Sequence, residues 1–308
     1  MNKVYFGDCR DSMRQMAKDG VKVQMCVTSP PYYGLRDYGV GGQIGAEQTP
    51  QEFIDNLVEV FACVWNILAD DGTLWVNLGD TYSAGGRGAG SEIQSANKGS
   101  ITGNVLGTWK VDGYRPKNLL GMPWKLAFAL QEFGWNLRQD IIWHKPNPMP
   151  ESVTDRCTKS HEYIFLLSKN QKYYYDYEAI KEPVSESTTL RLMQNIELQQ
   201  GSNRVPNKTN GNMKAVGNSE SRNKRSVWTV NTSTFKGAHF ATYPEELIEP
   251  CILAGSKVGD IVLDPFFGSG TTGQVSQNLG RKWIGCELNK EYETLQNQRL
   301  QQQGLELV

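Results

Sequence analysis

Four consecutive residues, Ser29-Pro30-Pro31-Tyr32, place a hydroxyl, two prolines and an aromatic ring directly after an apolar run. The prolines remove two N–H donors and stiffen the backbone, so carbonyl groups point in fixed directions beside the Ser29 hydroxyl. Such acceptors suit an –NH₂ group, and Tyr32 offers a face on which an aromatic ring can stack. Acceptors that hold both hydrogens of a conjugated amino group would localise its lone pair for attack. A rigid proline turn with a capping serine is the alternative interpretation.

A second cluster, Gly268-Ser269-Gly270-Thr271-Thr272-Gly273, fits the pattern G-x-G-x-x-G between a predicted strand and a predicted helix. Glu287 ends the next strand, where a carboxylate can accept hydrogen bonds from ribose hydroxyls. Together these features predict a nucleoside-bearing cofactor without identifying it, and a purely structural turn is the alternative. A Walker loop is not expected, because no Lys-Ser or Lys-Thr ends the run.

The elements that must position these motifs alternate between β-rich runs and amphipathic segments, which indicates an α/β fold with a largely parallel sheet. Strands are expected at residues 21–27, 73–78, 140–144, 162–167, 260–264 and 283–287. Helices are expected at residues 50–68, 123–133, 244–253, 271–279 and 290–302. The first helix has a predicted N-cap at Thr49, Pro50 in its first turn and Glu52 completing a capping box. The run Asp70-Asp71-Gly72 is expected to end that helix.

The position of the glycine loop constrains the topology. Only 35 residues follow Gly273, too few for the rest of a sheet. The remaining strands must therefore come from the N-terminal half, which predicts a circularly permuted sheet. Because ligands of open α/β sheets bind at the carboxyl ends of the strands, Ser29 and Gly268 are expected to face one crevice.

Two segments depart from the alternating pattern. Residues 79–114 are rich in glycine and too long for a simple connection, which predicts a mobile or functional loop. Residues 201–236 contain seven basic residues against one acidic residue, and the net charge of −1 for the whole chain conceals them. This segment is expected to contact phosphate groups, with a solvated loop as the alternative. Its basic residues are Arg204, Lys208, Lys214, Arg222, Lys224, Arg225 and Lys236.

The run Thr28–Tyr32 together with Leu263–Thr272 resembles the paired signature of the DNA amino-methyltransferases, which methylate cytosine N4 or adenine N6 with S-adenosylmethionine. The order, with the catalytic motif first, resembles the beta group of that family. Weaker matches lie at Gly7-Asp8-Cys9, at Trp143–Pro148 and at Trp283–Asn289. The resemblance implies a Rossmann-like S-adenosylmethionine methyltransferase fold, circularly permuted, with an inserted target-recognition region.

The resemblance also implies roles for residues. Ser29, the Pro30 carbonyl and Tyr32 would hold a flipped base, with Pro31 in the same catalytic motif. Asp8 would bind the adenine amino group of the cofactor, and Glu287 its ribose. The full cofactor set is Asp8, Cys9, Asp264, Pro265, Phe266, Gly268, Ser269, Gly270, Thr271, Thr272 and Glu287. The DNA-contacting set is Lys145, Arg204, Lys208, Lys214, Arg222, Lys224 and Arg225.

The implied domains are a catalytic part at residues 1–150, a target-recognition region at 151–236 and a cofactor-binding part of the same core at 237–308. At the position that matches Ser29, the cytosine-N4 enzymes of this family usually have Ser and the adenine-N6 enzymes usually have Asp. Cytosine N4 is therefore the favoured target and adenine N6 the alternative. The base must be flipped out of the duplex in either case. Other open alternatives are a DNA-binding module with a decayed catalytic core, an RNA or protein-glutamine substrate, and an NAD-dependent oxidoreductase, which would leave the Ser-Pro-Pro-Tyr motif without a role.

Composition narrows the setting. The chain has 308 residues, 39% of them hydrophobic, with six scattered Cys and three His, which predicts neither a zinc site nor a disulfide framework. No apolar run reaches the length of a membrane span, so a cytoplasmic protein without a membrane partner is expected. DNA is the expected partner, with a homodimer and a cognate restriction endonuclease left open. Cys251 is expected to be a core thiol, and residues 173–177, with four tyrosines, a partly buried strand.

Overall fold

The computed structural model describes residues 2–83, 104–105, 111, 113–185, 187, 221–232 and 243–301. The chain forms two compact units, Met1–Tyr175 with Ser226–Val308, and Asp176–Arg225. In the second unit β8 (Glu182–Pro183) pairs antiparallel with β9 (Ser221–Arg222). Most of the predicted loop 79–114 lies outside the described residues. Within it, β5 (Asn104–Val105) pairs with β3 (Arg36–Asp37).

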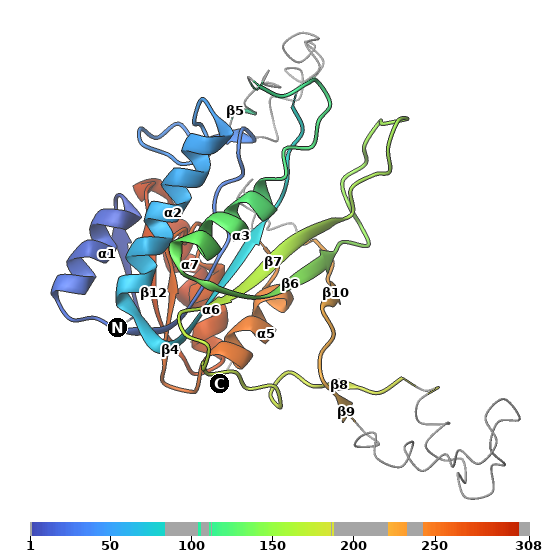
Figure 1. Ribbon diagram of the computed structural model, residues 1–308. Coiled ribbons are helices and arrows are strands. Elements are labelled where there is room, and N and C mark those ends of the chain that lie inside the picture. Colours follow the sequence, from blue (N-terminus) through green and yellow to red (C-terminus); the bar gives the residue numbers. More distant parts are fainter. Residues whose placement is uncertain are drawn as a thin grey trace, which may run out of the picture. The chain divides into compact units, whose positions relative to one another are not determined.

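An eight-stranded sheet in the order β1-β12-β11-β2-β4-β7-β6-β10 forms the centre of the first unit (Figure 1). Its strands are β1 (Lys3–Phe6), β2 (Val23–Thr28), β4 (Leu68–Leu78), β6 (Asn136–His144), β7 (His161–Ser168), β10 (Val227–Thr229), β11 (Ile261–Asp264) and β12 (Lys282–Glu287). All neighbouring strands are parallel except β7, which runs antiparallel to both β4 and β6. The predicted α/β fold with a largely parallel sheet is confirmed.

Helices cover both faces of this sheet. On one face α1, α2 and α3 pack side by side, and α5, α6 and α7 cover the other (Figure 1). The helices are α1 (Cys9–Lys18), α2 (Pro50–Ile67), α3 (Met122–Phe133), α5 (Glu245–Gly255), α6 (Thr271–Asn278) and α7 (Glu293–Gln301), with a 3₁₀ turn at η3 (Lys290–Tyr292) before the last. Among the described residues, no helix is both long and apolar enough to cross a membrane.

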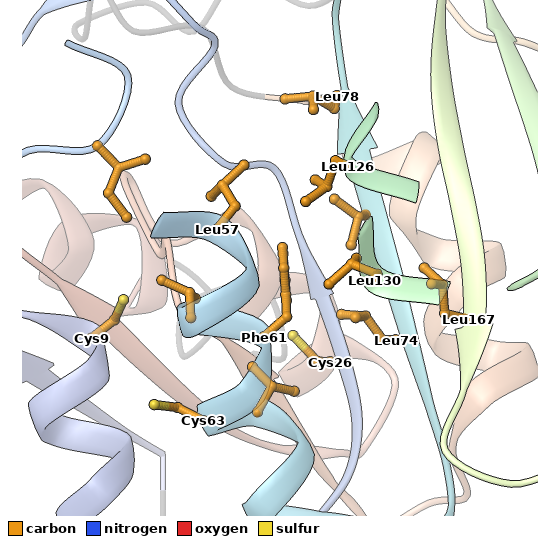
Figure 2. Close-up of a cluster of buried hydrophobic side chains, with 14 of the residues drawn as sticks. Cys9, Cys26, Leu57, Phe61, Cys63, Leu74, Leu78, Leu126, Leu130 and Leu167 are labelled. Carbon is orange, nitrogen blue, oxygen red and sulfur yellow. The ribbon is translucent and has the colours of Figure 1, made fainter. Parts of the chain in front are cut away.

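Helix α2 shows how the sequence produces the larger core. Thr49 Oγ1 accepts a hydrogen bond from the Glu52 N–H at 3.2 Å, and the Glu52 carboxylate accepts one from the Thr49 N–H at 3.1 Å, so the predicted capping box is confirmed. Figure 2 shows Leu57 and Phe61 of this helix among the buried side chains of β2, β4 and α3. Each such buried side chain contributes about 1.5–3 kcal/mol of transfer free energy.

Two sequence predictions fail locally. Helix α2 ends at Ile67, and the Asp70–Gly72 run belongs to β4 instead of ending the helix. The cause is tertiary pairing, since Leu68 pairs with Val23 of β2 and is fully buried. Residues 173–177 are not a strand but an irregular segment, in which Tyr175 stacks on Trp75 with ring centroids 6.3 Å apart.

Other elements were not predicted at all. Strand β1, helix α1 and strand β10 are short, and two of them lie at the edges of the sheet. Strand β10 carries Trp228, which is buried and thereby attaches this segment to the core. The Cys251 side chain is buried in α5, which confirms a core thiol.

The strand order places distant parts of the sequence beside one another. Strands β11 and β12, near the end of the chain, lie between β1 and β2, which come near its beginning. Because β2 and β11 are parallel neighbours, the residues after Thr28 and after Asp264 emerge at the same edge of the sheet.

Candidate active site

The Ser29–Tyr32 motif follows β2 and is held by side chains from two neighbouring strands. The Ser29 hydroxyl lies 3.3 Å from Asn77 Oδ1 on β4 and donates a hydrogen bond to it. The Tyr32 hydroxyl donates to Glu162 Oε2 on β7 at 2.6 Å. Burial of the phenol, with the Glu162 carboxylate beside it, raises the pKa of Tyr32 well above its usual range. Tyr32 therefore stays protonated and acts as a donor.

The ring of Tyr32 lies directly against the backbone after β4. A Cβ atom added at Gly79 would lie 2.4 Å from Cε2 of the Tyr32 ring, closer than real Cβ contacts allow. Only glycine at this position lets the aromatic ring approach so closely. The ring is thus confined by Gly79 on one side and tethered at its hydroxyl by Glu162.

Lys145, expected at the sequence level to contact DNA, forms an ion pair with Glu162. The side chains of both are largely buried, with 17% and 13% exposed, and Lys145 Nζ also lies 4.1 Å from the ring centroid of Trp143. Asn77 and Glu162 were not among the predicted site residues. Their sequence signal is a polar side chain at the end of an otherwise apolar strand, which becomes meaningful only once the neighbouring strands are known.

Asp264 ends β11 and is almost completely buried. It accepts hydrogen bonds from the Thr28 hydroxyl at 2.6 Å, from the Tyr243 hydroxyl at 3.0 Å, from the Thr272 hydroxyl at 2.5 Å and from the Phe266 N–H at 3.0 Å. Burial raises the pKa of this carboxyl. Its oxygens are occupied by these partners, so Asp264 shapes the glycine loop and joins it to the end of β2.

Glu287 ends β12 beside the glycine loop. Its carboxylate accepts hydrogen bonds from the N–H groups of Gly268 and Asn289, each at 2.8 Å, and burial raises its pKa. A carboxylate offers about four acceptor positions, so about two remain for the hydroxyls of a ribose. Gly268 and Gly270 have φ values of +53° and +89°, which only glycine adopts without strain. The site therefore fits the predicted nucleoside-bearing cofactor.

The other predicted cofactor residues surround this loop. Pro265 and Phe266 form the turn after β11, and Ser269, Thr271 and Thr272 are buried at the start of α6.

Two buried side chains of α7, which were not among the predicted site residues, donate hydrogen bonds to the same loop. Gln296 Nε2 donates to the Gly268 carbonyl at 2.7 Å. Arg299 donates to Ser269 Oγ at 2.5 Å and to Thr271 Oγ1 at 2.8 Å. The loop conformation thus depends on a helix that lies outside the motif.

Asp8 and Cys9 lie next to Glu287, since β1 pairs with β12 and the Gly7 N–H donates to the Glu287 carbonyl at 2.9 Å. Asp8 caps α1 and forms an ion pair with Arg10, which lowers the pKa of the Asp8 carboxyl. Burial raises the pKa of the Cys9 thiol to about 12. Their cofactor roles remain predictions.

The predicted DNA-contacting residues are only partly described. In the second unit the guanidinium groups of Arg222 and Arg225 both pair with Glu182, at 3.0 and 2.9 Å. Lys224 lies between them in the sequence. Arg204, Lys208, Lys214 and Lys236 lie outside the described residues.

Comparison with known proteins decides the family. A family model for N6 and N4 methyltransferases, described as DNA methylase, matches residues 23–298. The chain belongs to this family. The predicted relationship to the DNA amino-methyltransferases is confirmed, and this family depends on S-adenosylmethionine.

Relatives of this DNA methylase span nearly its full length. The chain is 47% identical to the type II methyltransferase M.SmaI of Serratia marcescens, covering 97% of this chain and 90% of the relative. It is 45% identical to the type II methyltransferase M.Cfr9I of Citrobacter freundii, covering 99% and 89%. Since these relatives are DNA methyltransferases, an oxidoreductase is no longer a candidate.

Solved structures confirm the fold of this DNA methylase. The cytosine-N4-specific PvuII DNA methyltransferase matches with a TM-score of 0.61 at 18% identity, over 96% of this chain and 85% of that chain. The M1.HpyAVI structure with S-adenosylmethionine matches with a TM-score of 0.54 at 20% identity, over 97% and 100%. The predicted Rossmann-like methyltransferase fold is therefore confirmed.

Proposed function

We propose that this DNA methylase transfers a methyl group to cytosine N4 at a specific DNA site. The observation that carries the proposal is the commitment of the Ser29 O–H to Asn77 Oδ1. A hydroxyl has one donor hydrogen and two acceptor lone pairs, so a Ser29 that donates to Asn77 presents its oxygen to an amino group as an acceptor. Serine in this position is also what the family resemblance associates with cytosine N4. Adenine N6 is the alternative, because its amino group offers the same two hydrogens.

The arrangement of strands supports a direct transfer. S-adenosylmethionine, when bound, supplies the methyl group. Glu287 and the Gly268–Thr272 loop would hold it, while Ser29, the Pro30 carbonyl and Tyr32 would hold the flipped base. Because β2 and β11 are neighbours, the two motifs share one edge of the sheet, and such alignment of reactants supplies much of a rate enhancement.

We further propose that the base is extruded from the duplex and stacks on Tyr32. Extrusion costs a few kcal/mol. Stacking on an aromatic ring recovers about 1–3 kcal/mol. The tether from Tyr32 to Glu162 supports this role, since a ring with a fixed plane loses little freedom when a base stacks on it.

For target recognition we propose the second unit, Asp176–Arg225, which lies inside the expected region 151–236. The rest of that region contributes β7 and β10 to the main sheet. The basic residues of the segment support phosphate contact. We also propose that the sheet is circularly permuted, which the place of β11 and β12 beside β1 and β2 supports. A cytoplasmic location and a cognate restriction endonuclease as partner are further proposals.

The test is mass spectrometry of nucleosides from DNA incubated with the protein and S-adenosylmethionine. N4-methylcytosine is expected, and Ser29→Ala is expected to slow its formation more than a hundredfold. Detection of N6-methyladenine would instead show that adenine N6 is the target and refute the cytosine proposal. Unmodified DNA, under conditions in which the cofactor binds, would refute the methyltransferase function of this chain.

A further inference from the structure

The Tyr32 side chain contacts a charged pair, Glu162 and Lys145, that is not part of the Ser29–Tyr32 motif. Glu162 Oε1 forms an ion pair with Lys145, and Glu162 Oε2 accepts from the Tyr32 hydroxyl at 2.6 Å. The Asn77 amide also reaches Glu162 Oε2, at 3.4 Å, and donates to the Tyr163 carbonyl at 3.1 Å. One carboxylate thus contacts both side chains that surround Ser29.

The register of the sheet brings Glu162 to this place. Strand β7 is antiparallel to β4 and β6, so its first residues lie at the edge where its neighbours end. Glu162 stands opposite Trp143, two residues before Lys145. Removing a carboxylate from water is costly unless a cation compensates it, and Lys145 supplies that cation.

We propose that Glu162, paired with Lys145, is a positioning residue that fixes Tyr32 and Asn77 for the target base. Glu162 holds the Tyr32 ring at its hydroxyl while Gly79 confines the ring on one side. Asn77 in turn holds the hydroxyl of Ser29. Lys145 therefore acts inside the protein, on Glu162, and not on a DNA phosphate. The inference rests on the proposed methyltransferase function and deepens it.

The first experiment uses Glu162→Gln, which keeps the shape of the side chain and removes its charge. Hydrogen bonds to charged groups have the strength to change rates about tenfold to hundredfold, so kcat is expected to fall by that factor. The dissociation constant of S-adenosylmethionine is expected to change less than twofold. DNA with 2-aminopurine in place of the target base is expected to show weaker fluorescence on binding, because fewer bases are held in the flipped position.

The matched control is Asp70→Asn. Asp70 pairs with Lys169 at 3.1 Å, at the opposite end of β4 and β7. This variant also loses one carboxylate–lysine pair of the same sheet, and its kcat and 2-aminopurine signal are expected to equal those of the wild type.

A second variant keeps the inference testable if Glu162→Gln does not fold. Tyr32→Phe retains the stacking ring and removes only the hydroxyl that Glu162 holds. It is expected to lower kcat about tenfold. When both variants fold, the double variant is expected to lose less than the product of the two single losses, because both break the same contact.

The variant Lys145→Gln tests whether Lys145 forms an ion pair inside the protein or contacts a DNA phosphate. The salt dependence of DNA binding is expected to stay unchanged. A decrease of the log–log slope by about 1 would instead indicate a lost phosphate contact and overturn the role of Lys145. Wild-type kcat in both Glu162→Gln and Tyr32→Phe would overturn the role of Glu162. Failure of the wild-type protein to methylate DNA would refute the proposed function itself.

Discussion

The contact of α7 with the glycine loop leads to a prediction about Arg299→Met. The variant keeps most of the alkyl stem and removes hydrogen bonds to Ser269 Oγ, Thr271 Oγ1 and Gln274 Oε1, at 2.5, 2.8 and 2.7 Å. Each hydrogen bond to a charged group contributes about 1.5–3 kcal/mol. Burial of the guanidinium opposes this gain and lowers the pKa of Arg299.

Because the burial cost offsets much of this sum, the net loss expected for Arg299→Met is about 2 kcal/mol of unfolding free energy. For a chain of this size that lowers the melting temperature by about 3 °C. Since two of the lost bonds hold the cofactor loop, the dissociation constant of S-adenosylmethionine is expected to rise about tenfold, which is about 1.4 kcal/mol. Differential scanning calorimetry and titration calorimetry measure the two effects.

Arg281→Met is the matched control. Arg281 also makes three hydrogen bonds, to Leu279 O at 2.6 Å, Ser256 O at 2.9 Å and Ser256 Oγ at 3.3 Å, but it lies where β12 begins, away from the loop. It is expected to lower the melting temperature and to leave cofactor affinity unchanged. Equal effects of the two variants on affinity would refute the reasoning, because the change would then follow stability alone.

Three further outcomes are expected. Ser29→Ala should lower kcat more than a hundredfold and leave cofactor affinity within twofold. Glu287→Ala should weaken cofactor binding more than it lowers kcat at saturating cofactor. Steady-state kinetics and titration calorimetry measure both variants, and equal losses of affinity would contradict the proposed roles. Gly79→Ala should destabilise the fold by about 1–3 kcal/mol in urea unfolding, because its Cβ would overlap the Tyr32 ring, and a neutral effect would speak against that contact. Asp8→Asn should cost about 1 kcal/mol at pH 7. Because the folded pKa of Asp8 is lowered, this cost should disappear as pH falls through and below 3.8, and a constant difference across pH would contradict the ion pair.

The sequence predicts the parts of the site that are local. The capping box at Thr49 and the glycine loop at Gly268 are each encoded within a few residues, so pattern and spacing suffice to find them. The end of the sheet shared by Ser29 and Gly268 is also predicted, because ligands of open α/β sheets bind at the carboxyl ends of the strands.

The rest depends on which strands become neighbours. Glu162 and Asn77 become site residues because β7 turns antiparallel beside β4, and neither carries a motif that announces this. Arg299 reaches the loop only through helix packing. Tertiary pairing also overrides a local signal at Asp70, where a predicted helix end becomes strand because Leu68 joins β2.

The place of β11 and β12 in the sheet has a consequence for synthesis of the chain. A chain still emerging from the ribosome possesses β1 and β2 but lacks the two strands that separate them. Until β11 is synthesised, β2 exposes an unpaired edge, and Thr28 has no Asp264 to which it can donate. Assembly of the proposed base site and of the proposed cofactor site is therefore completed in the same late step. Loss of β11 and β12 would therefore separate β1 from β2 and the rest of the sheet.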